Sequence, residues 1–172
     1  MTASPGLAVE TGGVTIVTHM DSRIDSASRT ILATPRAIFR AFLDPEVIGK
    51  WRPPAGMHAE IYDFEPREGG GYRMAFVHHD KTARSGKTEP DRDVFTGRFV
   101  ELIPETRIVE DVDFRSDDPA FTGTMRITTQ LTPVSDGTKV TFVAEHVPTG
   151  ISADDHRKGM ESSLKNLAML LE

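Results

Sequence analysis

The chain has 172 residues, which is enough for one domain with its own hydrophobic core. Its composition, 38% hydrophobic and 27% charged, is typical of a soluble globular protein. Lys and Arg total 20 against 26 Asp and Glu, so the formal charge of −6 argues against nucleic acid or an anionic membrane as the main partner. The chain contains no cysteine, which excludes disulfides, thiol catalysis and thiolate metal ligands.

The first twenty residues are small, polar and interrupted by Gly and Pro. We expect residues 1–20 to form a flexible tail and residues 21–172 to form a single domain. Residues 14–18 could add a short strand or could belong to the tail. The segment lacks the basic and apolar regions of a signal peptide, and no apolar run approaches the roughly 20 residues of a membrane helix. We therefore expect a cytoplasmic protein.

After a first strand that ends with residues 29–33, two signals for helix starts follow in close succession. Thr34-Pro35 and Asp44-Pro45 each place a capping side chain before a proline at the first helical position. Apolar residues recur at helical spacing after both signals. The pattern predicts two short consecutive helices.

From Met57 onward, apolar and polar residues alternate as they do in strands. The predicted strands are residues 58–64, 72–79, 93–102, 107–114, 121–131 and 138–147. Short turns join most of them, which predicts an antiparallel sheet that is too large to stay flat. Residues 79–92 form a long polar connection that we expect to be mobile.

The C-terminal segment 153–172 carries one continuous apolar stripe. Met160, Leu164, Leu167 and Leu171 are spaced at i, i+4, i+7 and i+11, which is typical of an amphipathic helix. Ser152 is the expected capping residue. Because the stripe must be covered, we predict that this helix lies across the sheet.

Several local motifs accompany this order of elements. They are residues 33–42 (ATPRAIFRAF), 44–46 (DPE), 50–51 (KW), 69–73 (GGGYR), 95–101 (FTGRFVE), 104–107 (PETR) and 159–164 (GMESSL), with Leu167. With these motifs, the order of elements resembles the helix-grip fold of the START-like (SRPBCC) superfamily. Within it, the chain is similar to the heat-shock-protein-90 ATPase activator homologue-like family over roughly residues 29–172. This resemblance implies an α+β fold in which a curved antiparallel sheet of six to seven strands wraps around the C-terminal helix.

The resemblance also implies a cavity between the sheet and the last helix. Strand parity and the helical stripe indicate the side chains that would line it. They are Trp51, Tyr72, Met74, Phe76, His78, Phe95, Gly97, Phe99, Phe121, Met125, Phe142, Ala144, Met160, Leu164 and Leu167. Gly97 and Ala144, opposite Met160, should leave open space. The alternative is that these residues pack together as an ordinary core. The family often has Trp at the positions of Arg52 and Met160, so its ligand preferences cannot be transferred.

Polar residues near this face carry the possible chemistry. His78 and His146 are the candidate catalytic bases, Arg73 and Arg98 could stabilise an oxyanion, and His58 could also reach the cavity. We interpret Glu60, Glu110 and Glu145 as residues of a solvated face. His78, His79 and Asp80 alternate in direction along a strand, so we expect no shared metal ion there.

These observations leave three hypotheses for the function. The first is binding of a small, largely apolar or amphipathic molecule, with no cofactor and no chemistry. The second is a cyclase or hydrolase that uses a cavity histidine, and the third is a protein-interaction domain like the chaperone activators. An open apolar cavity would favour the first, and a filled core would favour the third.

Overall fold

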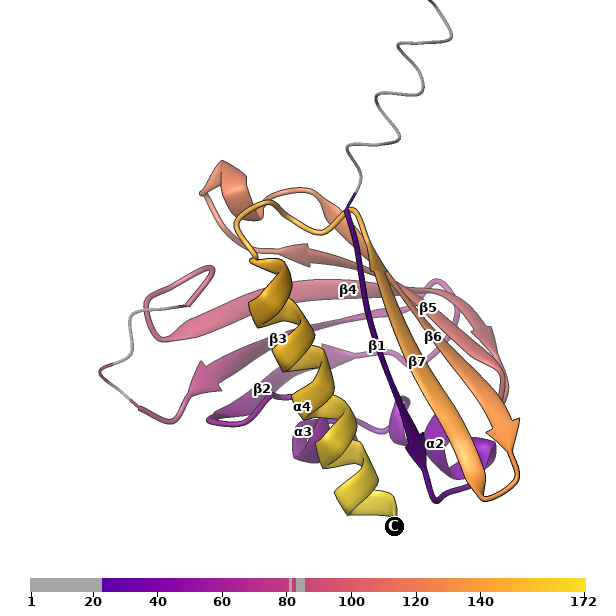
Figure 1. Cartoon of the computed structure of the whole chain (residues 1–172). Helices are drawn as coiled ribbons and strands as arrows, with labels where there is room; N and C mark the ends of the chain where they lie inside the picture. The colour runs from indigo at the N-terminus through magenta and orange to yellow at the C-terminus, as the bar shows by residue number, and fades with distance from the viewer. Residues whose placement is uncertain (1–22, 81, 83–85) are drawn as a thin grey trace, which may run out of the picture.

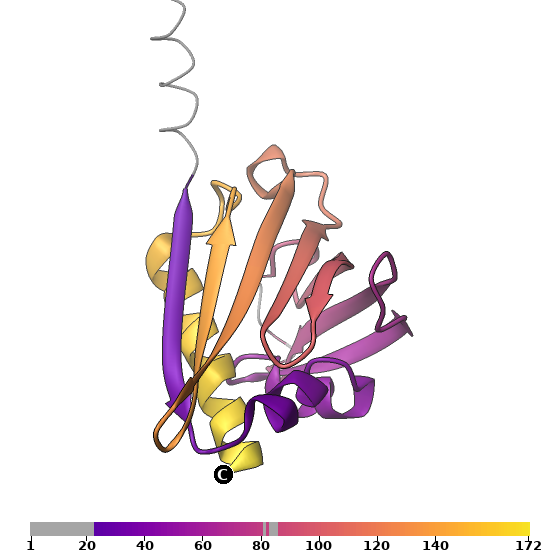
Figure 2. The ribbon, with the colours of Figure 1, turned by 90° about the vertical axis from the view of Figure 1, so that its right-hand side faces the viewer.

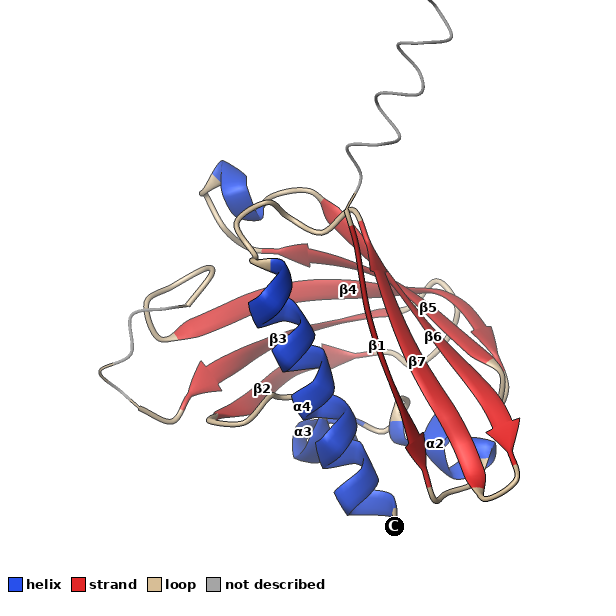
Figure 3. Ribbon diagram, viewed as in Figure 1, coloured by secondary structure: helices blue, strands red, loops and turns tan. Residues whose placement is uncertain are grey.

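The computed structural model describes residues 23–80, 82 and 86–172. The possible strand at residues 14–18 and part of the 79–92 connection lie outside these residues. The elements are β1 (Ile24–Ile31), α2 (Pro35–Ala41), α3 (Pro45–Trp51), β2 (Met57–Phe64), β3 (Gly71–His78), β4 (Arg92–Ile103), β5 (Arg107–Phe114), the 3₁₀ turn η1 (Pro119–Phe121), β6 (Thr124–Val134), β7 (Gly137–Glu145) and α4 (Ala153–Leu171). Figure 3 shows them coloured by type.

One antiparallel sheet of seven strands forms the frame of the molecule, in the order β1-β7-β6-β5-β4-β3-β2. Neighbours in the sheet are neighbours in the chain except for β1, which pairs with β7 along its whole length. The sheet is strongly twisted, and α4 lies across one of its faces (Figures 1 and 2). The predicted helix-grip α+β fold is confirmed.

The helix starts predicted from the sequence are confirmed in atomic detail. The Thr34 hydroxyl accepts a hydrogen bond from the Ala37 amide at 3.1 Å, and the Asp44 carboxylate accepts one from the Glu46 amide at 3.0 Å. Each cap satisfies one of the free amides at a helix N-terminus, as Ser152 does for α4.

The apolar stripe of α4 is buried as predicted. Met160, Leu164 and Leu167 are all buried in the core, and Leu171 packs at its margin. Short side chains on the same helix, Ser163 and Ala168, are buried too. No helix among the described residues is long and apolar enough to cross a membrane.

Two boundaries in the sheet differ from the prediction. Phe121 lies in η1 and not in a strand, because Asp118 caps a short turn at Pro119 and Gly123 then takes a φ of 99°. His146 was expected to follow the alternation of β7. That strand ends at Glu145, and His146 takes a left-handed φ of 59°, which removes it from the inward face.

Candidate functional site

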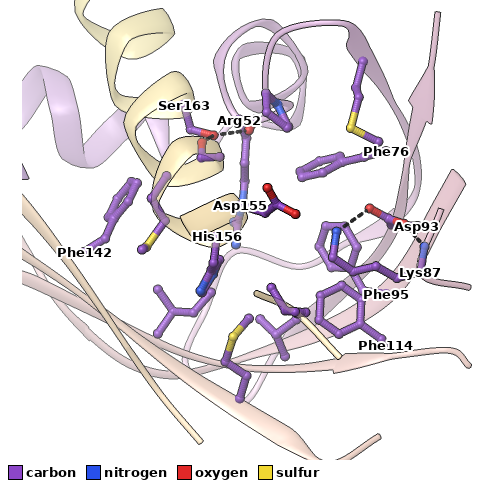
Figure 4. Close-up of a pocket in the computed structure, with 18 of the residues that line it drawn as sticks. Arg52, Phe76, Lys87, Asp93, Phe95, Phe114, Phe142, Asp155, His156 and Ser163 are labelled. Atoms are coloured by element: carbon purple, nitrogen blue, oxygen red, sulfur yellow. Dashed lines mark hydrogen bonds and ion pairs between the residues drawn. The ribbon is translucent and has the colours of Figure 1, made fainter. Parts of the chain in front are cut away.

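A cavity of about 330 Å³ lies between the N-terminal half of α4 and the sheet. Figure 4 shows most of the side chains that line it. Its lining residues are Phe42, Trp51, Arg52, Pro54, Met57, Phe76, Lys87, Asp93, Phe95, Glu110, Val112, Phe114, Phe121, Met125, Ile127, Thr129, Phe142, Gly150, Ile151, Ser152, Asp155, His156, Gly159, Met160 and Ser163.

The middle of the cavity is apolar and largely aromatic. Phe76 and Phe95 meet edge to face with ring centres 4.9 Å apart, and Phe95 and Phe114 are 6.0 Å apart. Phe142 closes the opposite side, below α4 (Figure 4). Phe76, Phe95 and Phe114 thus form an aromatic belt, which favours a ligand with an apolar, flat body.

Burial distinguishes a mouth from a floor. Gly150, Ser152 and Asp155, at the start of α4, are exposed and mark the mouth. The floor consists of buried residues from α3 and the middle of the sheet, among them Trp51 and Glu110.

The floor carries a polar cluster of Arg52, Tyr72 and Glu110. Arg52 donates to Glu110 Oε1 at 2.9 Å and to the Tyr72 hydroxyl at 3.1 Å. The Tyr72 hydroxyl donates to the same Glu110 oxygen at 2.6 Å. Glu110 is 1% exposed, so the cluster holds an ion pair away from bulk water.

The cluster raises the pKa of two of its members, Tyr72 and Arg52. Burial raises the pKa of Tyr72 well above its ordinary value. The Glu110 carboxylate raises this pKa further, whereas the Arg52 cation lowers it. Burial disfavours the charge of Arg52, but Glu110 and Tyr72 outweigh it and raise its pKa. Tyr72 therefore remains a hydrogen-bond donor and Arg52 remains a cation.

A second ion pair lies closer to the mouth. Lys87 donates from its backbone amide and from Nζ to the buried Asp93 carboxylate, the latter at 2.9 Å (Figure 4). Lys87 Nζ also lies 5.8 Å from the centre of the Phe114 ring. The pair therefore places two opposite charges at the edge of the aromatic belt.

Among the residues that the structure describes, His156 is the histidine that lines the cavity. Its Nδ1 lies 2.8 Å from Asp25 Oδ2 on β1, and Arg23 also donates to this oxygen at 3.0 Å. Burial lowers the pKa of His156, and Asp25 partly opposes the shift. The ring is therefore neutral near pH 7, with Nε2 left for another partner.

Comparison with known proteins identifies the family. The family model described as "Activator of Hsp90 ATPase homolog 1-like protein" matches residues 32–172. The chain belongs to this family. No curated protein matches it. The fold is the helix-grip fold of the START-like (SRPBCC) superfamily, and family membership supports interaction with a ligand or a protein in general.

Solved structures show the same architecture. A crystal structure of a Chromobacterium violaceum protein is 32% identical, with a TM-score of 0.76, and the match covers 87% of this chain and 98% of the other. A Rhizobium loti protein is 26% identical, with a TM-score of 0.66 and coverage of 86% and 96%. A Rhodobacter sphaeroides protein at 21% identity, with a TM-score of 0.68 and coverage of 88% and 97%, shares the fold.

The structure brings part of the predicted lining together. The predicted residues that border the cavity are Trp51, Phe76, Phe95, Phe121, Met125, Phe142 and Met160. Behind them, in the packed core, lie Tyr72, Met74, Phe99, Ala144, Leu164 and Leu167. Tyr72 still reaches the site through its hydroxyl, which contacts two floor residues.

Gly97 does not leave the open space that was expected. A Cβ atom at this position would lie 2.1 Å from the Tyr72 ring, so the ring occupies the space that a side chain would fill. The absence of a side chain at Gly97 allows Tyr72 to reach Glu110.

The polar residues proposed from the sequence lie elsewhere. His146 is exposed, and neither His146 nor the half-buried His78 is among the lining residues. Exposed His58 stacks on His79 with ring centres 5.4 Å apart. No group of three His, Cys, Asp or Glu suited to a metal occurs in the described part of the chain.

The two arginines proposed as oxyanion ligands face away from the cavity. Arg73 lies 4.4 Å from the centre of the Tyr62 ring, and Arg98 is 3.7 Å from Asp111. Both side chains are exposed. The cations that line the cavity are Arg52, at the C-terminal end of α3, and Lys87.

The sequence interpretation of Glu110 was wrong. We had assigned it to a solvated face, but its side chain is buried. Its strand parity matches that of Ile108, Val112 and Phe114, which all face the same side, so a signal was present. His156 was also identifiable, since it precedes Met160 by one helical turn on the same stripe. For Lys87 we find no sequence signal.

Proposed function

We propose that the protein binds a small, largely apolar molecule in this cavity, without chemistry of its own. The cavity itself is the observation that supports the proposal most strongly. Its volume falls in the range of small-molecule sites, roughly 300–1,000 Å³, and apolar side chains surround its middle. A filled core would have favoured an interaction domain.

Filling the cavity tests this proposal. Met160 is 8% exposed and lines the cavity, so Met160→Trp adds an indole to the space that a ligand would occupy. Met169→Trp is the matched control, because Met169 lies on the same helix and is 70% exposed. We expect the affinity for the neutral dye N-phenyl-1-naphthylamine to fall about tenfold or more in Met160→Trp alone.

Thermal unfolding of the same variants completes the test. Met160→Trp should retain its stability, because its bulk enters open volume. A loss of about 1–3 kcal/mol, as expected for an overpacked core, together with unchanged dye affinity would contradict the proposal.

A second candidate function is hydrolysis, and the Asp25–His156 hydrogen bond favours it. A carboxylate on Nδ1 orients the ring and leaves Nε2 as a proton acceptor, which is the arrangement of a general base. His156 could take a proton from water while the water oxygen attacks an ester carbonyl. The C–O bond of the ester then breaks, and the imidazolium returns the proton to the departing alcohol oxygen.

Release of 2-naphthol from 2-naphthyl acetate tests this second function. If His156 is the base, His156→Gln should lower the rate at least 100-fold, while exposed His58→Gln should not change it. Equal rates in both variants and in buffer would reject catalysis and leave ligand binding unaffected.

A further inference from the structure

The floor of the cavity presents a carboxylate with one oxygen still available. Both hydrogen bonds of Glu110, from Arg52 and from Tyr72, end on Oε1. Oε2 receives none from the residues that the structure describes, although the side chain is 1% exposed. Glu110 lines the cavity, and a carboxylate oxygen without a partner there can accept a hydrogen bond from a bound donor.

Thr129 provides a buried, unsatisfied polar group beside Glu110. Its side chain is fully buried and borders the cavity, and its hydroxyl has no hydrogen-bond partner among the described residues. The strand register pairs Glu110 with Ile127, so Thr129 lies on the same face, diagonally across from Glu110. Its hydroxyl hydrogen can rotate about the Cβ–Oγ1 bond toward a bound group.

Charge balance limits what the floor can accept. At the floor Arg52 is paired with Glu110, and closer to the mouth Lys87 is paired with Asp93. An anionic ligand would therefore meet no uncompensated cation at the floor, and a cationic ligand would meet no uncompensated anion. Burying such a charge without a partner is costly, so a neutral group is favoured.

On the basis of the proposed binding function, we infer that the cavity selects neutral apolar molecules that carry a hydroxyl, such as phenols. A hydroxyl combines a donor and an acceptor in one atom. It donates to Glu110 Oε2 and accepts from the Thr129 hydroxyl, while its apolar body lies in the aromatic belt of Phe76, Phe95 and Phe114. An ether or ketone has no proton to donate to Glu110.

Three naphthalenes with different substituents test the inference on the intact protein. They are 2-naphthol, 2-methylnaphthalene and 2-naphthoate, which place a hydroxyl, a methyl or a carboxylate on the same ring. Because the three differ in hydrophobicity, the measured quantity is the change in each dissociation constant when a residue is substituted, determined by calorimetry or fluorescence.

Glu110→Gln should invert the preference for charge. It leaves the Arg52 cation without its carboxylate, so we expect 2-naphthoate to bind at least tenfold more tightly and 2-naphthol about tenfold more weakly. Thr129→Val keeps the shape of the side chain and should weaken 2-naphthol binding several-fold without affecting 2-methylnaphthalene. Thr128→Val is the control, since Thr128 lies on the opposite face of β6.

The outcomes separate this inference from the function on which it rests. If the wild-type protein binds neither 2-naphthol nor 2-methylnaphthalene, the binding function and the inference both fail. If both bind, and neither Glu110→Gln nor Thr129→Val changes their relative affinity, hydroxyl selection is wrong while ligand binding stands. Thr129→Val provides this result even if Glu110→Gln does not fold.

Discussion

At the scale of single residues, the Arg52–Glu110 pair is the most consequential feature. Both charges lie out of bulk water, and Tyr72 supplies an additional hydrogen bond to the carboxylate. A buried pair contributes little net stability, but losing one partner leaves an unpaired charge in a medium of low polarity. We therefore expect the loss of either Arg52 or Glu110 alone to destabilise the protein.

Glu110→Ala should destabilise the protein by about 3–5 kcal/mol, because it leaves the Arg52 charge buried without its partner. The surface pair Arg107–Glu101, with an Nε–Oε1 distance of 2.8 Å, is the matched comparison. Each of its side chains is 38% exposed, so Glu101→Ala should cost less than about 1 kcal/mol. Urea unfolding measures both values, and equal losses would show that the Glu110 carboxylate is solvated.

His156 should titrate below its ordinary pKa of 6.5, because burial disfavours the imidazolium. Around and below pH 6.5 the folded state therefore binds fewer protons than the unfolded state. The free energy of unfolding then decreases as the pH falls from 6.5 through the folded-state pKa of His156. NMR titration measures the midpoint, and His156→Gln assigns the signal. Asp25→Asn should lower the midpoint further, since Asp25 favours the charged ring against Arg23 and Lys87. An unchanged or higher midpoint would contradict the Asp25 contact.

At the scale of elements, local signals predicted the helices well and the site poorly. Caps and apolar periodicity lie within a few residues of one another, so Thr34, Asp44 and Ser152 could be assigned from the sequence. The floor of the cavity depends on contacts between residues far apart in the chain. Arg52 meets Glu110 across 58 residues, and no local pattern contains that pairing.

The buried face of α4 should account for much of the stability of the fold. Leu164 and Leu167 are 1% and 0% exposed, so truncating either to Ala should cost about 2–5 kcal/mol. Met169→Ala on the exposed face of the same helix should change the free energy of unfolding by less than about 0.5 kcal/mol. Chemical denaturation of the three variants tests this, and similar values for all three would mean that α4 does not anchor the core.

At the scale of the whole molecule, the sheet is open and has two different edges. β2 forms one edge and carries a register shift between Ile61 and Asp63. β1 forms the other edge, and α4 packs along it. The sequence predicted the antiparallel order of the later strands because short turns join them. It could not show that β1 joins β7, since that pairing spans most of the chain.

The two edges should differ in amide hydrogen exchange. Strands β5 and β6 are bonded on both sides and should exchange most slowly. Of the edge strands, β1 should be better protected than β2, because α4 covers it. Exchange followed by mass spectrometry distinguishes the two, and faster exchange in β1 than in β2 would indicate that α4 detaches readily.

The pairing of β1 with β7 has a consequence for how the protein is made. During synthesis β1 emerges from the ribosome well before the strand that pairs with it, Gly137–Glu145, and the helix that covers it, Ala153–Leu171. The contact between the Leu32 amide and the Glu172 carboxylate joins residues 140 positions apart. Contacts of such long range form slowly. During synthesis β1 therefore remains unpaired until β7 has been made. In a product that is truncated before residue 137, the unpaired edge of β1 would stay exposed to pairing with other nascent chains.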